Sequence, residues 1–129
     1  MNDFEFTDPK KAEDYLNFCL SKEGKNQQNL IFNALEPLLP KNSDLSILDP
    51  GCGMGWLSGK LTGRYKKICA CDSSGVLLNY AKKNFPGVEF ASVDLEKPLP
   101  YPDASFDLVI TCLTLHDLQN LETVYNTKH

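Results

Sequence analysis

A glycine-rich turn is the segment of this chain whose residue types and spacing most clearly imply chemistry. It reads Asp49-Pro50-Gly51-Cys52-Gly53-Met54-Gly55 and follows a short apolar run over residues 45–49. Glycines at a strand-to-helix turn let the backbone turn tightly, adopt positive φ and approach a ligand without an intervening Cβ. Because ligands of open α/β sheets bind at the carboxyl ends of the strands, the turn predicts a nucleotide-binding loop.

The spacing of the glycines separates the candidate nucleotides. Gly51, Gly53 and Gly55 form G-x-G-x-G, whereas the dinucleotide fingerprint G-x-G-x-x-G would need a glycine in place of Trp56. No Gly-Lys-Ser/Thr follows, which excludes a Walker phosphate loop. Asp49, two positions before the first glycine, would repel a pyrophosphate but would pair with a ligand ammonium. The turn therefore favours S-adenosylmethionine over NAD.

Three further polar residues lie at or just beyond the ends of predicted strands. Asp72 can accept hydrogen bonds from ribose hydroxyls, and Asp94 can accept one from an adenine amino group. His116, just past the fourth predicted strand, is a candidate general base at neutral pH. Methyl transfer from a sulfonium depends mainly on positioning, so the reaction does not require such a base.

Apolar periodicity predicts the elements that position these residues. Two amphipathic helices come first, over 10–22 and 26–39, with Asp8 as the cap of the first, Pro9 in its first turn and Gly24 as the break. Strands at 45–49, 67–72, 88–93 and 106–112 then alternate with helices at 56–61, 74–84 and 118–125. This order predicts a Rossmann-like three-layer αβα fold with a mostly parallel sheet of about four strands and helices on both faces.

The two N-terminal helices carry apolar side chains whose position is also predicted. On the first helix, Tyr15 and Phe18 are expected in the core, and the alternative is that they cover the ligand pocket as a lid. The apolar face of the second helix consists of Leu30, Ile31, Ala34, Leu35 and Leu38.

Length and composition describe one globular domain. The 129 residues, 42% of them hydrophobic and 23% charged, suffice for one core, so 1–129 is predicted as a single domain with a helical N-terminal segment over 8–40. A net charge of −4 disfavours nucleic acid as a partner. Without a signal peptide or an apolar stretch of roughly 18 residues, the protein is expected in the cytoplasm, away from membranes. Five cysteines without a Cys-x-x-Cys pair predict reduced thiols and no metal site.

Residues 47–55 resemble motif I of the class I S-adenosylmethionine-dependent methyltransferases. Three more segments are similar to that family in order and spacing: 71–74 resembles the acidic ribose-binding strand end, 92–95 the adenine-side aspartate and 105–111 the fourth-strand motif. The resemblance thus covers residues 45 to about 118.

The resemblance implies a function and a role for each site residue. It places Asp49 and the turn Gly51, Cys52 and Gly53 near the methionine moiety, Asp72 on the ribose, Ser73 beside the adenine, Asp94 and Leu95 around the adenine edge, and Thr111 towards the sulfonium. The implied activity is methyl transfer to an unidentified small-molecule acceptor. The alternative is a non-catalytic or truncated module that binds S-adenosylmethionine or S-adenosylhomocysteine and works through a partner chain.

The sequence departs from the family in the number of its strands. The family's sheet holds seven strands in the order 3-2-1-4-5-7-6, and this chain supplies four. The apolar strand at 106–112 would then lie at an edge of the sheet, where strands pair readily with other chains. Self-association through this strand is therefore predicted, and whether the 129 residues are catalytically active by themselves is left open.

Overall fold

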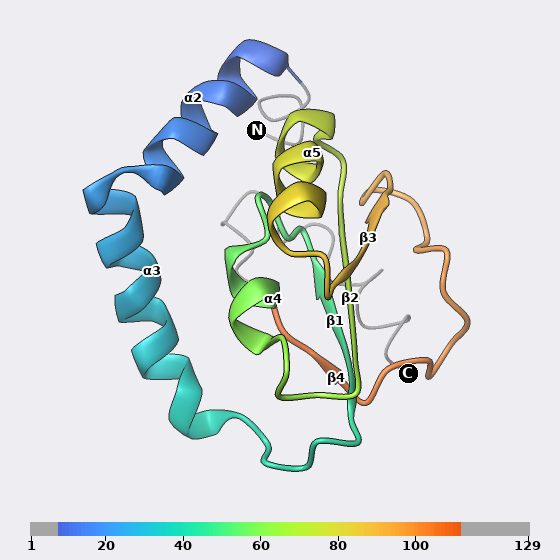
Figure 1. The fold of residues 1–129 in the computed structure, drawn as a ribbon. Coiled ribbons are helices and arrows are strands. Elements are labelled where there is room, and N and C mark those ends of the chain that lie inside the picture. Colours follow the sequence, from blue (N-terminus) through green and yellow to red (C-terminus); the bar gives the residue numbers. More distant parts are fainter. Residues whose placement is uncertain (1–7, 112–129) are drawn as a thin grey trace.

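The computed structural model describes residues 8–111, which form a four-stranded, all-parallel sheet with helices packed against it (Figure 1). In chain order the elements are α2 (Pro9–Leu20), α3 (Lys22–Leu35), the short 3₁₀ helix η1 (Glu36–Leu38), β1 (Ser46–Pro50), α4 (Trp56–Leu61), β2 (Lys67–Asp72), α5 (Gly75–Asn84), β3 (Glu89–Ser92) and β4 (Leu108–Val109). The strands lie in the order β3-β2-β1-β4. The predicted α/β fold with a parallel sheet of four strands is confirmed.

The two faces of the sheet are covered differently. Ile47 and Ile68 face α3, α4 and α5, whereas their neighbours Leu48 and Cys69 face the segment 93–106. Helices are predicted on both faces, but within residues 8–111 they cover only one. The segment on the other face contains Pro98, Pro100 and Pro102, which cannot continue a helix, and it buries Leu95, Leu99 and Phe106 instead.

The N-terminal helices join at Ser21 rather than at Gly24. Asp8 caps α2 by accepting a hydrogen bond from the amide of Lys10 at 3.0 Å, as predicted. Ser21 ends α2 and caps α3, and its hydroxyl accepts from the amide of Gly24 at 3.1 Å. Gly24 therefore lies in the first turn of α3, where a Cβ would come within 2.1 Å of the carbonyl oxygen of Phe18. The predicted break at Gly24 is wrong because close packing, and not helix termination, requires this glycine.

The apolar face predicted for α3 lies largely outside the core. Leu30 is 71% exposed and Leu38, in η1, is 79% exposed. The helix packs through Phe32 instead, which is 8% exposed and whose ring lies 5.4 Å from both the Lys60 ammonium and the Arg64 guanidinium. Figure 1 shows why: α2 and α3 run as an arc beside α5 and α4, so only one narrow side of α3 meets the rest of the fold.

The fourth strand is much shorter than the predicted 106–112. Only Leu108 and Val109 pair as a strand with β1, and the amides of Asp107 and Ile110 extend the contact by donating to Ser46 and Leu48. The Asp107 carboxylate accepts from the amide of Ser46 at 2.8 Å. Among the described residues β4 has one neighbouring strand, which leaves it at the predicted edge of the sheet.

Candidate cofactor site

The carboxyl ends of β1, β2 and β3 lie at one edge of the sheet because these strands are parallel and in register. Pro50 pairs with Cys71, and Asp72 pairs with Ser92. The glycine loop, defined here as residues 51–55, therefore begins beside the tip of β2. This arrangement brings Asp49 close enough to Asp72 for the two charges to interact.

The glycine loop adopts backbone angles that other residues rarely take. Gly51, Gly53 and Gly55 have φ values of +73°, +58° and +90°. At Gly55 a Cβ would also lie 3.0 Å from the Cβ of Ala81 and 3.1 Å from the rings of Phe85 and Phe90. The third glycine therefore lets α4 start close against α5 and β3.

The amides of the glycine loop bond within the protein. Gly51 and Cys52 both donate to the carbonyl of Cys71, at 2.8 and 3.0 Å. Gly53 donates to the Asp72 carboxylate at 2.8 Å, and Gly55 donates to the carbonyl of Cys52 at 3.0 Å. A loop of this type is expected to offer free amides to a ligand, and these four do not. The geometry disfavours a phosphate, which would need those donors.

Asp72 joins three parts of the site. Its Oδ2 accepts from the amide of Gly53, and its Oδ1 accepts from the amide of Ser74 at 2.9 Å. Ser74 caps α5 by accepting from the amide of Leu77 at 3.2 Å. Asp72 is 8% exposed. Asp72 therefore holds the glycine loop and the start of α5 together at the tip of β2.

Asp49 is the most deeply buried carboxylate of the site, at 2% exposure. Its Oδ2 accepts a hydrogen bond from the hydroxyl of Ser58 at 2.7 Å, and Ser58 is the one donor to this carboxylate among residues 8–111. Burial raises the pKa of Asp49 to about 7; the charge of Asp72 acts in the same direction, and the Ser58 hydrogen bond opposes both. A buried carboxylate oxygen without a donor suits a cationic ligand group, so the residues present fit the cationic cofactor expected from the sequence.

The other predicted site residues lie around the same edge, with unequal exposure. Ser73 is half-buried, and Asp94 is exposed with its Oδ1 accepting from the amide of Glu96. Leu95 is 3% exposed and packs in the core, which leaves little of it for an adenine ring. Thr111 donates its hydroxyl to the carbonyl of Pro50, next to the glycine loop. His116 lies outside the described residues.

Tyr15 of α2 lies over the glycine loop. Its Cε2 atom would be 3.9 Å from a Cβ built on Gly53, and its side chain is 38% exposed. Phe18, one turn further, is 44% exposed. Core packing is predicted for both aromatic residues, and the structure contradicts this. The alternative, a position over the ligand pocket, fits Tyr15 because α2 packs against α5 (Figure 1) and its Tyr15 ring lies beside Gly53.

The buried thiols near the loop are poor nucleophiles. Cys52 is 8% exposed, and burial, with the charges of Asp49 and Asp72, raises its pKa far above the ordinary value. The same causes raise the pKa of Cys71 to about 12. Since the thiolate is the reactive form, both cysteines serve packing. Within residues 8–111, no group of three His, Cys, Asp or Glu side chains comes together as a metal site would require.

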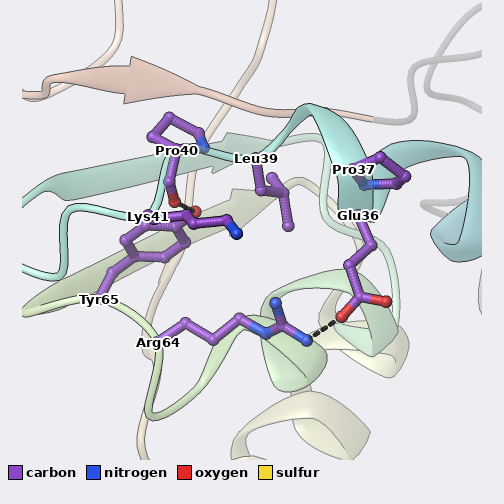
Figure 2. A pocket seen from close by; sticks show the side chains of 7 residues that line it. All are labelled: Glu36, Pro37, Leu39, Pro40, Lys41, Arg64 and Tyr65. Carbon is purple, nitrogen blue, oxygen red and sulfur yellow. Dashed lines mark hydrogen bonds and ion pairs between the residues drawn. The ribbon is translucent and has the colours of Figure 1, made fainter.

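A large cavity lies away from the loop, near the C-terminal end of α3 (Figure 2). Its volume is about 680 Å³, and it is lined by Glu36, Pro37, Leu39, Pro40, Lys41, Arg64 and Tyr65. The polar groups there are largely satisfied already: Arg64 pairs with Glu36, and the hydroxyl of Tyr65 donates to the carbonyl of Pro40 at 2.6 Å. None of the predicted site residues lines it. The glycine loop is therefore the candidate functional site.

Known proteins match this chain over most of its length. Residues 48–127 match the methyltransferase domain family. The malonyl-[acyl-carrier protein] O-methyltransferase of Acetivibrio thermocellus is 33% identical over 110 residues, which are 82% of this chain and 38% of that protein. The chain thus spans about two fifths of the length of this relative.

Solved structures agree with the fold. The crystal structure of an S-adenosylmethionine-dependent methyltransferase from Mesorhizobium loti has a TM-score of 0.63 at 32% identity, covering 74% of this chain and 47% of that chain. The phosphoethanolamine N-methyltransferase 1 of Haemonchus contortus, in complex with S-adenosylhomocysteine, has a TM-score of 0.70 over 92% of this chain and 28% of its own. At 13% identity the second match shows the shared fold alone. None of the helices in the described part of the chain is long and apolar enough to cross a membrane.

Proposed function

Because the chain belongs to the family of S-adenosylmethionine-dependent methyltransferases, we propose that its glycine loop binds S-adenosylmethionine for methyl transfer to a small-molecule acceptor. The chain contains the segment that resembles motif I and the acidic residues at the strand ends. The cofactor would supply an electrophilic methyl group on a sulfonium. The residues of this chain would bind and orient it.

One observation carries the proposal: two carboxylates lie at the loop, while four of its five amides bond within the protein. Four loop amides bond internally, while Asp49 and Asp72 lie directly beneath and beside the loop. Such a site repels phosphates and attracts a cation. S-adenosylmethionine carries a sulfonium and an ammonium and has no phosphate, whereas NAD carries a pyrophosphate. The electrostatics of the site therefore favour the methyl donor.

The remaining contacts follow from position at the strand ends. We assign Asp72 to the ribose hydroxyls and Ser73 to the adenine, because Asp72 is the last residue of β2 and Ser73 follows it directly. Asp94 is exposed just beyond β3, where its carboxylate can accept from an adenine amino group. Leu95 would reach the adenine only by leaving its core position, so its part is the weakest of these assignments.

The methionine end of the ligand would lie over the glycine loop. Gly51, Cys52 and Gly53 form its floor, Asp49 faces its ammonium from below, and Thr111 lies on the side of β4. Tyr15 would cover it from α2. His116 would act as a general base where the acceptor must lose a proton, although positioning of the reactants accounts for most of the rate of methyl transfer.

A non-catalytic cofactor-binding module is the second candidate, and the edge position of β4 favours it. With one neighbouring strand among the described residues, β4 offers a row of backbone groups to another chain. We propose that the chain associates through this edge with a second copy or a partner. The four free cysteines among the described residues fit a reducing compartment such as the cytoplasm.

Calorimetric titration tests the proposal directly. We expect S-adenosylhomocysteine and S-adenosylmethionine to bind and NADH not to bind. Methyl transfer would then be sought with tritiated S-adenosylmethionine and small carboxylic acids, and malonyl-[acyl-carrier protein] joins the acceptor set because the related enzyme of Acetivibrio thermocellus carries that name. Binding of NADH alone would overturn the proposal, and cofactor binding without any transfer would favour the second candidate.

A further inference from the structure

Ser58 and Asp49 make a buried contact that belongs to neither the ribose nor the adenine assignments. Ser58 lies on α4 with no exposed surface, and Asp49 lies on β1 with 2% exposed. Their oxygen atoms are 2.7 Å apart. Asp49 comes two residues before the glycine loop and Ser58 three residues after it, so the contact closes the loop from beneath.

The surroundings of Asp49 contain negative or neutral groups. Asp72 approaches from the tip of β2, Ser58 from α4, and the thiols of Cys52 and Cys71 from the loop and from β2. Within residues 8–111 the ion pairs join Lys10 to Asp14 and Arg64 to Glu36, and neither involves Asp49. Asp49 is therefore buried beside a second carboxylate and takes part in no ion pair among residues 8–111. Such pairs favour a shared or retained proton.

A serine is suited to hold a carboxyl group that changes its charge. Its hydroxyl is both a donor and an acceptor, so the contact can persist whether Asp49 is ionised or protonated. Thr62, at the end of the same helix, donates its hydroxyl to the carbonyl of Ser58 at 3.3 Å. That bond fixes the backbone of Ser58 without touching Asp49.

We propose that Asp49 is protonated in about half of the ligand-free molecules at pH 7 and releases that proton to solvent when the ammonium of the methyl donor binds, with Ser58 as the residue that positions the carboxyl group. This inference rests on the proposed cofactor. Binding would bring a positive charge to Asp49, which takes part in no ion pair among residues 8–111, and that charge favours the ionised carboxylate. The raised pKa of about 7 agrees with this assignment, because it places the exchange within the neutral range.

Because ligand binding is coupled to proton release from Asp49, the affinity for the ligand should depend on pH. If the bound form stays ionised, the affinity for S-adenosylhomocysteine increases roughly eightfold between pH 6 and pH 7.5, since a growing share of the empty protein has already lost the proton. S-adenosylhomocysteine keeps the ammonium and lacks the sulfonium. Its binding therefore reports the interaction of Asp49 with the ligand ammonium alone.

The first test uses the empty protein. Carboxyl ¹³C NMR of aspartate-labelled protein follows the titration of Asp49, which Asp49→Asn identifies by loss of its signal. We expect a midpoint near pH 7 that moves upward in Ser58→Ala, because the variant removes the hydrogen bond that favours the ionised form. Thr62→Val is the matched control: it removes a hydroxyl from the same helix and should leave the midpoint in place. A wild-type midpoint near the ordinary value of 3.8 overturns the inference.

The second test measures the proton itself. Titration of S-adenosylhomocysteine at pH 7 in buffers of different ionisation enthalpy reports the protons released, and we expect close to half a proton per ligand in the wild type and none in Asp49→Asn. Binding without proton release overturns the inference and leaves the proposed function standing. Failure of the ligand to bind at any pH overturns the proposed function, and the inference with it.

Discussion

The amide of Gly53 donates to Asp72 Oδ2 at 2.8 Å and ties the glycine loop to the tip of the neighbouring strand. The other oxygen of Asp72 accepts from the amide of Ser74 at the start of α5. One side chain thus fixes a loop and a helix that follow two different strands. A residue expected only to meet the ribose also builds the site in which the ribose would bind.

Replacing Asp72 should therefore remove a contact to the ribose and release the glycine loop, and both effects should weaken ligand binding. We expect Asp72→Ala to weaken S-adenosylhomocysteine binding by about 1–3 kcal/mol, the range for hydrogen bonds to a charged acceptor. Asp72→Asn keeps one acceptor oxygen and should lose less. Calorimetry measures both variants, and Asp44→Ala, remote from the loop, controls for the loss of a surface charge. An unchanged affinity in Asp72→Ala would remove the ribose assignment.

Replacing Asp49 by asparagine should stabilise the empty protein at neutral and alkaline pH. The folded-state pKa of Asp49, about 7, lies above the ordinary 3.8, so the folded state holds the proton more tightly. Wild-type stability therefore falls as the pH rises from 4 to 7, by about 1.4 kcal/mol per pH unit at most. Asp49→Asn lacks this loss.

Urea denaturation of both proteins between pH 4 and pH 8 measures the difference. The advantage of Asp49→Asn should grow up to pH 7 and level off above it. A constant difference across this range would show that Asp49 ionises in the folded protein as it does in the unfolded chain.

Two glycines with similar φ values allow the cost of a strained backbone to be separated from the cost of a crowded contact. Gly55 and Gly63 have φ values of +90° and +87°, but a Cβ at Gly55 meets Ala81 at 3.0 Å, whereas one at Gly63 meets nothing within 4 Å. Gly63→Ala should cost about 1–2 kcal/mol for the left-handed backbone. Gly55→Ala should cost roughly 1–3 kcal/mol more, because it also overpacks the contact between α4 and α5. Equal losses in chemical denaturation would mean that the crowded contact relaxes freely.

Self-association should depend on the edge strand. Val109 is half-buried and belongs to β4, which has one partner strand among the described residues. Light scattering at micromolar concentration should give a mass above that of one chain, and Val109→Lys should reduce it, since charged residues protect exposed edges. Leu30→Lys, on the exposed side of α3, is the control for a lysine elsewhere on the surface. A monomeric wild type would contradict the prediction.

Much of the site was predictable because it depends on residues that are neighbours in the chain. Helix α4 and strand β2 have the predicted bounds, and the cap of α2 by Asp8 follows from a local pattern. Gly51, Gly53 and Gly55 have the positive φ that their types and order imply. Local sequence determines such features because backbone conformation and capping act within a few residues.

Contacts between distant residues were not predictable in the same way. Ser58 has no pattern that marks it as the partner of Asp49, nine residues earlier, and Tyr15 reaches Gly53 only because α2 folds back over the loop. The apolar pattern of α3 favoured the side that includes Leu30, yet the helix buries Phe32. Periodicity identifies an apolar face but does not say which neighbour is available to cover it.

The sequence by itself determined the order of strands and helices, the conformation of the glycine loop and the acidic character of the strand ends. Only the tertiary structure decided that three loop amides donate to Cys71 and Asp72, and that Asp49 is buried against Ser58. The physical reason is that hydrogen bonds and pKa values in this site depend on which strands lie side by side. Adjacency of β1 and β2 places Asp49 and Asp72 beside a loop in which four amides bond within the protein.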